Sequence, residues 1–265
     1  MPHLTPLVDA HCHLESDEFA GNLDDIVAMG RAAGIEAFIT AAWAPEVWER
    51  SRAIAEHYPG VYFALGIHPW YVRDPHLNRI AELAGAREKG ACAIGEIGLD
   101  AKAEAAPFDL QEAAFEAQLR IARDLDLPVV VHCRGAFDEL IRTVKQAGMP
   151  RRGGLIHAFS GSVEIAERLM DLGFSFSMGG SLTYRNSKKR ERVLHRIFPG
   201  HFLLETDSPD IPPVEARGFN CPNTPANILY NLKAAAEALG EPPETVALRT
   251  TENAVRLFGL DIGEP

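Results

Sequence analysis

Eight short apolar runs recur along the chain with longer amphipathic segments between them, and this alternation is the strongest constraint on the fold. Strands that alternate with helices form parallel βαβ units. The segment 110–126 is typical of the intervening helices, because Phe115, Leu119 and Ala122 share one helical face. The expected strands are residues 7–11, 35–41, 61–67, 91–97, 128–132, 154–158, 174–178 and 202–206.

The length of the chain and the end of its first expected strand favour a closed barrel over an open sheet. A TIM (β/α)8 barrel typically needs about 250 residues, and this chain has 265. An open doubly wound sheet usually has a glycine-rich loop after its first strand, whereas the sequence here is DAHCHL, without glycine. Helices expected at 224–238 and 243–258 complete the outer ring, and no linker or repeat divides the chain. We therefore expect an α/β fold, with one TIM-like barrel domain over residues 1–265.

Composition excludes some partners and leaves others open. The formal net charge of -11 argues against a broad electrostatic grip on nucleic acid, but not against a small phosphate-bearing substrate, because bound cations invert the local field. No apolar run approaches the about 20 residues that cross a membrane, so we expect no membrane partner, and no segment indicates an obligate protein partner. The cysteines form no CxxC pair and no basic-then-apolar leader opens the chain, which predicts reduced thiols in a cytoplasmic protein.

The ten histidines fall into two groups by their position relative to the expected strands. One group lies in the terminus, helices or loops, where solvated or capping side chains are expected: His3, His57, His76, His195 and His201. The other group lies at or just beyond the C-terminal ends of strands: His11, His13, His68, His132 and His157. Barrel enzymes carry their chemistry at this edge. Histidines gathered there, together with carboxylates, therefore indicate a metal site.

The first and fourth strands supply three candidate metal ligands. Side chains alternate across a strand, so His11 and His13 of DAHCHL point the same way. Asp9 shares their parity and is a candidate to hold one imidazole ring by a hydrogen bond. Glu96 interrupts the apolar strand AIGEIGLD, and an unpaired buried carboxylate is costly. A carboxylate can bridge two metals, so we interpret Glu96 as a bridging ligand; a buried salt bridge to an arginine is the alternative.

The fifth and sixth strands end in equivalent histidines. His132 closes the apolar run in PVVVHCR, and His157 occupies the matching position in GGLIHAFSG. Arg134 has the parity of His132, and its planar guanidinium suits bidentate recognition of phosphate or carboxylate. An outward Arg134 that pairs with a helix carboxylate is the other interpretation.

The eighth and third strands add the remaining candidates. Glu205 and Asp207 of FLLETDSPD have the same parity. Asp207, further out, suits both metal ligation and acceptance of a proton from a bound water, whereas the deeper Glu205 is expected to orient its neighbours by hydrogen bonding. His68 in GIHPW has no metal partner in its own segment. We interpret it as a substrate contact, with a structural role as the alternative.

Six motifs, in order, resemble those of the TatD family of metal-dependent hydrolases and deoxyribonucleases, within the amidohydrolase superfamily: DAHCHL, GIHP, IGEIGLD, VVVHCR, IHAFSG and LLETDSPD. The resemblance implies a distorted TIM barrel that holds two divalent metal ions, with Glu96 shared between them. It implies that one ion is bound by His11, His13 and Asp207, and the other by His132 and His157. Many amidohydrolases use a carboxylated lysine as the bridge, but the first lysine after Glu96 is Lys102, which favours TatD. The segment AKAEAAPFD departs from the family pattern, since it lacks the usual aromatic pair.

These residues lead to the hypothesis of metal-assisted phosphodiester hydrolysis by a deoxyribonuclease resembling a 3′–5′ exonuclease, acting on single-stranded DNA ends or small nucleic-acid fragments. Two ions would lower the pKa of a shared water and stabilise the leaving oxygen; Asp207 and Glu96 are the catalytic candidates. Arg134 and His68 would grip the other phosphate oxygens. The ligand types are compatible with Zn, Mg, Mn or Ni. The alternatives are an amidohydrolase or lactonase acting on a small carbonyl substrate, and a non-catalytic metal-binding barrel, which would predict a broken ligand set.

Two further features bear on nucleic acid. The basic run 185–192, RNSKKRER, is either a solvated helix face or a guide for a phosphate backbone toward the metals. Aromatic residues near the expected mouth are candidates for base stacking or for packing at the rim: Trp43, Trp70, Phe159 and Tyr184.

Overall fold

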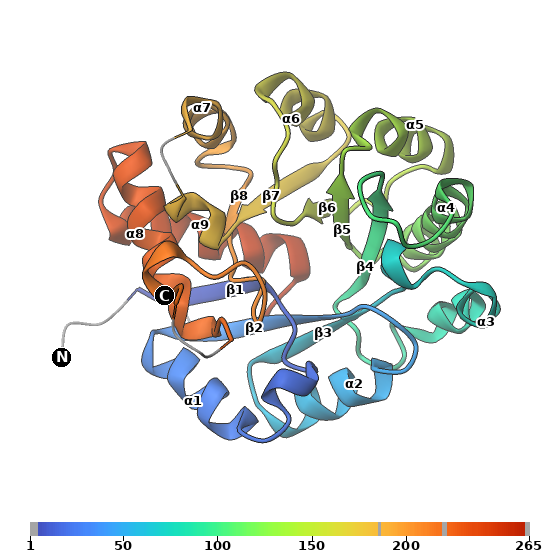
Figure 1. Cartoon of the computed structure of the whole chain (residues 1–265), viewed down its shortest axis with the longest axis horizontal. Helices are drawn as coiled ribbons and strands as arrows, with labels where there is room; N and C mark the ends of the chain where they lie inside the picture. The colour runs from blue at the N-terminus through green and yellow to red at the C-terminus, as the bar shows by residue number, and fades with distance from the viewer. Residues whose placement is uncertain (1–4, 185–186, 219–221, 263–265) are drawn as a thin grey trace.

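The computed structural model describes residues 5–184, 187–218 and 222–262 and contains one sheet of eight parallel strands in sequential order, as the alternation predicts (Figure 1). The expected TIM-type fold is confirmed. The strands are β1 Leu7–Cys12, β2 Ile35–Ala42, β3 Val61–Leu65, β4 Ala93–Asp100, β5 Val129–Arg134, β6 Gly154–Ile156, β7 Phe174–Met178 and β8 Phe202–Leu204.

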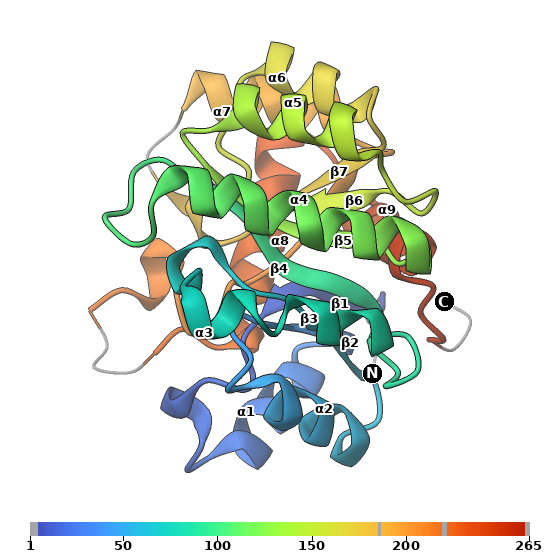
Figure 2. The ribbon, with the colours of Figure 1, turned by 90° about the vertical axis from the view of Figure 1, so that its right-hand side faces the viewer.

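Helices surround the sheet on its outer side, and Figure 2 shows α4 and α5 lying across it. The buried face of α4 carries Phe115, Leu119 and Ala122, the stripe expected from the sequence. The helices are α1 Leu23–Ala32, α2 Trp48–His57, α3 Asp74–Leu77, α4 Phe108–Leu125, α5 Phe137–Ala147, α6 Val163–Met170, α7 Lys188–Ile197, α8 Ile228–Leu239 and α9 Pro243–Phe258.

Helix α9 closes the end of the barrel where the strands begin. The Asn253 amide donates to the carbonyl of Phe202 at the start of β8, and the Thr251 hydroxyl donates to the carbonyl of Pro6, just before β1. Leu257 and Phe258 join a buried cluster with small apolar residues of the strands. The opposite end, where the strands finish, is left for the histidine-bearing loops.

The barrel is distorted where its ends meet. No ladder joins β8 to β1 in the described residues. Instead, the Asp207 amide donates to the His11 carbonyl at 2.9 Å, and the His13 amide donates to the Ser208 carbonyl at 2.8 Å. These bonds lie beyond the end of β8, so the closure of the barrel itself fixes Asp207 beside the histidines of β1.

Strand β4 lies unusually close to β5. At Gly98, where φ is +134°, a Cβ atom would lie 2.0 Å from the carbonyl oxygen of His132, so only glycine fits. The ladder continues to the pair Asp100 and Arg134, three residues beyond the expected end of the strand at 97. This extension brings Asp100 to the mouth of the barrel.

Some peripheral expectations need correction or fall outside the described residues. His76, expected to be solvated or capping, is buried, with its ring nitrogens bonded to the carbonyl of Tyr71 at 2.5 Å and to Glu46 at 2.6 Å. Cysteines 12, 92 and 133 are free, while Cys221 and His3 lie outside the described residues. Among the described helices, none is both long and apolar enough to cross a membrane.

Candidate metal centre

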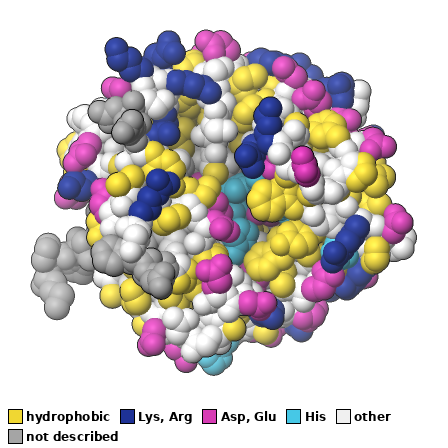
Figure 3. Space-filling view, in the orientation of Figure 1, with side chains coloured by type: hydrophobic (Ala, Val, Ile, Leu, Met, Phe, Trp, Pro, Cys, Tyr) yellow, Lys and Arg dark blue, Asp and Glu magenta, His cyan; other side chains and the backbone are white. Residues whose placement is uncertain are grey.

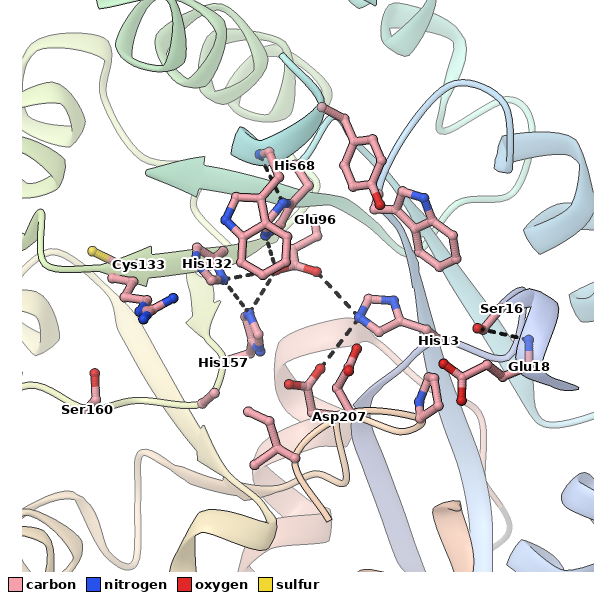
Figure 4. A pocket seen from close by; sticks show the side chains of 18 residues that line it. His13, Ser16, Glu18, His68, Glu96, His132, Cys133, His157, Ser160 and Asp207 are labelled. Atoms are coloured by element: carbon pink, nitrogen blue, oxygen red, sulfur yellow. Dashed lines mark hydrogen bonds and ion pairs between the residues drawn. The ribbon is translucent and has the colours of Figure 1, made fainter. Parts of the chain in front are cut away.

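The candidate ligands meet in a cavity of about 570 Å³ at the C-terminal ends of the strands. Figure 3 shows histidines at the bottom of a hollow, with apolar side chains on one side and acidic side chains on the other. Figure 4 shows Glu96 in the middle of the centre, with His13 and Asp207 to one side of it and His132 and His157 to the other.

One oxygen of Glu96 faces the residues of β1 and the loop after β8. Its Oε2 lies 3.5 Å from Nε2 of His11 and 3.6 Å from Nε2 of His13. Asp207 Oδ1 lies 3.3 Å and 3.5 Å from the same two nitrogens. These atoms form the first set, which we call the Oε2 half-site: His11, His13, Asp207 and Glu96 Oε2.

The other oxygen of Glu96 faces histidines from β5 and from the loops after β3 and β6. Its Oε1 lies 2.8 Å from Nε2 of His157, 3.5 Å from Nδ1 of His132 and 3.2 Å from Nε2 of His68. The His157 and His132 nitrogens are 3.4 Å apart. We call this set the Oε1 half-site: His132, His157, His68 and Glu96 Oε1.

The spacing of these atoms fits bound divalent ions. Ligands about 2.0–2.2 Å from a tetrahedral metal lie about 3.4 Å from one another, and the Oε2 half-site spans 3.3 to 3.6 Å between its facing atoms. Both ring nitrogens of the buried His11 and Nδ1 of His157 lack a hydrogen-bond partner among the described residues. A buried imidazole without a partner is costly, so the donor set and its unsatisfied atoms suit a metal.

Burial and neighbouring charges set the ionisation of this cluster. Burial raises the pKa of Glu96, but His157, His68 and His132 together outweigh that effect, and the pKa falls well below its usual range. Burial likewise raises the pKa of Asp207, and the rings of His11 and His13 reverse the shift, so the pKa is lowered. Burial lowers the pKa of His11 to about 4. At neutral pH both carboxylates are therefore ionised and His11 is neutral, and these forms bind metals.

Two histidines are held with one ring nitrogen directed at the centre. Nδ1 of His13 donates to the Ala41 carbonyl at 2.8 Å, so Nε2, which faces Glu96, is the nitrogen that can bind a metal when it loses its proton. Burial lowers the pKa of His13, but its hydrogen bonds to Asp207 and Glu15 and the charges of Glu15 and Glu96 together raise it well above its usual value, so metal binding displaces a proton. Nε2 of His132 donates to Asp100 Oδ2 at 3.0 Å, which leaves its Nδ1 unprotonated. A hydrogen bond on the far ring nitrogen is the usual way in which proteins orient a metal-binding imidazole.

His68 has the opposite arrangement. Its Nδ1 accepts the backbone N–H of Trp70 at 3.1 Å, because His68 caps the 3-10 helix Pro69–Tyr71. In a neutral imidazole the other nitrogen must then carry the proton. Nε2 of His68 is therefore a donor, aimed at Glu96 Oε1, and it offers a hydrogen where His132 offers a lone pair.

Comparison with known proteins shows the family to which this chain belongs. The model of the TatD related DNase family matches residues 8–259. The chain belongs to the TatD family. The membership expected from the six motifs is confirmed, and with it the assignment of the chain as a metal-dependent hydrolase.

Relatives of similar length support the assignment. The chain is 33% identical over 258 residues to the uncharacterized metal-dependent hydrolase YabD of Bacillus subtilis, covering 96% of this chain and 100% of YabD. It is 32% identical over 262 residues to the 3'-5' ssDNA/RNA exonuclease TatD of Klebsiella pneumoniae, covering 97% and 99%. The crystal structure of YjjV, a TatD homologue from Escherichia coli, superimposes with a TM-score of 0.89 at 32% identity and covers 97% of this chain and 100% of YjjV.

Three further predictions about this TatD chain can be compared with the contacts. Arg134 lines the cavity, its side chain is 59% exposed, and its nearest carboxylate, Asp100 at 4.0 Å, belongs to β4 rather than to a helix. Glu205 is buried and accepts the Ala158 amide at 2.9 Å, as expected of an orienting residue. Asp9 does not hold an imidazole ring as expected; it accepts the amide and hydroxyl of Thr206. The approach of the loop after β8 to β1 provides Asp9 with these closer donors.

Sequence analysis missed two carboxylates that contact candidate ligands. Asp100 binds Nε2 of His132, and Glu15 Oε1 lies 3.4 Å from Nδ1 of His13. The alternation of side chains along a strand could have identified both carboxylates. Asp100 is four residues after Glu96 in IGEIGLD and Glu15 is two residues after His13, so each shares the parity of a candidate ligand.

The expected aromatic and basic features divide between the mouth and the rim. Trp43 and Trp70 line the cavity. Phe159 is buried, and the Tyr184 hydroxyl donates to the Pro212 carbonyl, so both of these rings pack at the rim. Within the run 185–192, residues 185 and 186 lie outside the described residues. The Lys189 ammonium donates to the carbonyl of Ser160, a cavity residue, at 2.9 Å, so α7 begins beside the mouth.

Proposed function

We propose that this chain is a two-ion phosphodiesterase that cleaves single-stranded DNA ends in the 3′–5′ direction. The observation that carries the proposal is the position of Glu96, whose two carboxylate oxygens face separate donor sets. His11, His13 and Asp207, whose ligand atoms lie within 4.8 Å of one another, would hold one divalent ion. His132 and His157, whose facing nitrogens are 3.4 Å apart, would hold the other, with Glu96 shared. Such ions, when bound, supply Lewis acidity that activates water and stabilises developing negative charge.

In this proposal Asp207 acts as the general base. Asp207 lines the cavity, its Oδ1 lies 3.3 Å from the His11 nitrogen, and its carboxylate is ionised, as a proton acceptor must be. The amide bond from Asp207 to the His11 carbonyl fixes its backbone. Asp207 therefore orients the attacking water and takes its proton.

His68 and Arg134 bind the phosphate oxygens that do not react. The Nε2–H of His68 and the guanidinium of Arg134 are both donors, and both lie on the Oε1 side of Glu96. Phosphate oxygens accept hydrogen bonds and carry charge, so these donors hold the substrate in register with Asp207.

DNA is the proposed substrate because related proteins carry nuclease names. These include the 3'-5' ssDNA/RNA exonuclease TatD of Klebsiella pneumoniae and the putative deoxyribonuclease tatdn3 of Danio rerio, which is 31% identical to this chain. Trp43 and Trp70 in the cavity suit unstacked bases. The acidic chain, with a formal charge of -11, suits a short strand end better than a long duplex.

The test is hydrolysis of 3′-labelled and 5′-labelled single-stranded DNA by chelator-treated protein across a series of zinc, magnesium, manganese and nickel. Amide and lactone panels are run in parallel. We expect mononucleotide release from the 3′ end, and no release from a His132→Ala, His157→Ala double variant. Hydrolysis of an amide or lactone without hydrolysis of DNA would replace the proposal with the carbonyl alternative.

The role of Asp207 has its own test. The Asp207→Asn variant keeps an oxygen that can bind a metal but loses most of its basicity. We expect turnover to fall by about 100-fold or more, as for other general bases, with metal content close to that of the wild type. A turnover equal to that of the wild type would exclude Asp207 as the base.

A further inference from the structure

We propose that Trp70 is the platform on which the base of the bound nucleotide stacks; this inference rests on the proposed phosphodiesterase function. Trp70 is 48% exposed, although it lines the cavity above the centre. A large exposed apolar ring in a binding cavity is more informative than one isolated on the outer surface. Its contacts indicate what kind of group it receives.

Both N–H donors of Trp70 already have acceptors within the protein. Its backbone N–H donates to Nδ1 of His68 at 3.1 Å, and its indole N–H donates to Asp100 Oδ2 at 2.8 Å. A ligand that approaches the exposed part of the ring therefore meets only its π surface. An anionic phosphate gains little from such a surface, whereas a nucleobase stacks on it.

The same two contacts fix the ring in position before a ligand binds. Trp70 stands nearly perpendicular to the His68 ring, with centroids 5.0 Å apart and an interplanar angle of 89°. Its centroid lies 5.9 Å from that of His132. A platform held in advance loses little conformational freedom on binding, so more of the stacking energy appears as affinity.

Trp70 and Arg134 both approach the same carboxylate oxygen. Asp100 Oδ2 binds the indole N–H of Trp70 at 2.8 Å, and it also lies 4.0 Å from the guanidinium of Arg134. A cation suited to phosphate and a flat ring suited to a base are therefore neighbours through one carboxylate. The rings of Trp43 and Tyr71, with centroids 6.4 Å apart, continue the aromatic wall of the cavity.

Stacking on an indole depends little on which base is present, because every base has a π face. The subsite therefore predicts a preference for strands with bases over strands without them, and only a weak preference among the bases. Base–aromatic stacking corresponds to about a 5-fold to 150-fold effect on kcat/KM.

The experiment compares two single-stranded octamers of equal length and charge, oligothymidylate and an abasic tetrahydrofuran strand. The readout is the ratio of their kcat/KM values with metal-loaded enzyme. We expect the wild type to favour oligothymidylate by about 5-fold to 150-fold, and Trp70→Ala to bring the ratio close to one. Trp70→Phe, which keeps a ring without the N–H, should retain most of the preference. Tyr230→Ala, at a 42% exposed aromatic residue on α8, is the control and should behave as the wild type.

The outcomes separate the two proposals. If the ratio of kcat/KM values in Trp70→Ala equals that of the wild type, whether or not both values fall, the base platform is overturned and phosphodiester hydrolysis stands. Failure of the wild type to cleave either strand overturns the proposed function instead. In that case binding of thymidine 5′-monophosphate against deoxyribose 5-phosphate decides the platform: a wild-type preference lost in Trp70→Ala supports it, and no preference refutes it.

Discussion

Asparagine in place of Asp100 should weaken one half of the metal centre and spare the other. Asp100 Oδ1 accepts the amides of Lys102 and Ala103 at 2.8 and 3.0 Å, while Oδ2 accepts Nε2–H of His132 and the indole N–H of Trp70. If the asparagine oxygen still accepts the amides of Lys102 and Ala103, the NH2 group faces the Nε2–H of His132 and the indole N–H of Trp70, which are also donors. His132 must then move its proton from Nε2 to Nδ1 to make a hydrogen bond. Its Nδ1 lone pair, which faces Glu96 Oε1 at 3.5 Å, is lost to the metal.

The magnitude follows from the contacts that are broken. Removal of the partner that orients a metal-bound histidine typically weakens metal affinity by about 10-fold to 100-fold, or about 1.4 to 2.7 kcal/mol. His13 is oriented separately, by the carbonyl of Ala41 at 2.8 Å, so the Oε2 half-site should keep its affinity. Calorimetric titration of chelator-treated Asp100→Asn with zinc or manganese should therefore show one unchanged site and one weakened site.

Glu18→Gln is a matched control, since Glu18 is an exposed carboxylate that lines the same cavity without contacting a candidate ligand. It should bind both ions as the wild type does. Two wild-type affinities in Asp100→Asn would refute the tautomer reasoning, and so would an equal loss at both sites, because the half-sites would then not be independently oriented.

Three other outcomes can be measured on the same protein. Gly98→Ala should lower the thermal unfolding midpoint by about 6 °C or more, because its Cβ would lie 2.0 Å from a carbonyl oxygen of β5, whereas Gly85→Ala, with no atom within 4 Å, should change little. The double variant Lys188→Gln, Lys189→Gln should lower the salt-dependence slope of single-stranded DNA binding by about 1. An unaltered slope would mean that these side chains are solvated and do not contact DNA. Metal affinity should rise with pH up to about 9, because binding displaces a proton from His157. Burial lowers the pKa of His157, but Glu96, Asp207 and Glu205 together outweigh burial and raise that pKa to about 9. A flat profile of metal affinity from about pH 6 to 9 would contradict this.

Periodicity was sufficient for the architecture but not for the ends of the strands. All eight expected strands exist, because hydrophobic alternation between strands and helices is a property of the local sequence. Strands β6 and β8 end two residues early, just before left-handed conformations at Ala158, with φ 44°, and Asp207, with φ 52°. Strand β4 begins two residues later than expected and ends three residues later, because pairing with β5 continues past its apolar residues. Such ends are decided by neighbouring strands that the local pattern does not contain.

Side-chain parity predicted that the candidate ligands lie at one edge of the barrel, but it does not predict which groups form hydrogen bonds with one another. Parity assigned Asp9 to a histidine ring, yet the closure between β8 and β1 gave it Thr206 as a partner. Parity also does not predict which ring nitrogen faces the centre as a donor in His68 and as a lone pair in His132. That difference depends on which ring nitrogen finds a partner, and the partner is the Trp70 amide for one and Asp100 for the other.

The two half-sites differ in charge, and this difference orients the proposed substrate. Asp207 adds a second carboxylate on the Oε2 side, and Asp210 stands at the same mouth. On the Oε1 side the donors His68 and Arg134 face the cavity, and the carboxylate of Asp100 is already engaged by its own donors. With a divalent ion in each half-site, the Oε1 side keeps the larger net positive charge because it lacks a second carboxylate ligand, and it therefore binds a phosphate group more strongly. The phosphate should therefore lie toward the Oε1 side, where His68 and Arg134 bind it, while the general base Asp207 belongs to the Oε2 side. Substitution of Arg134 should then raise KM, and substitution of Asp207 should lower kcat.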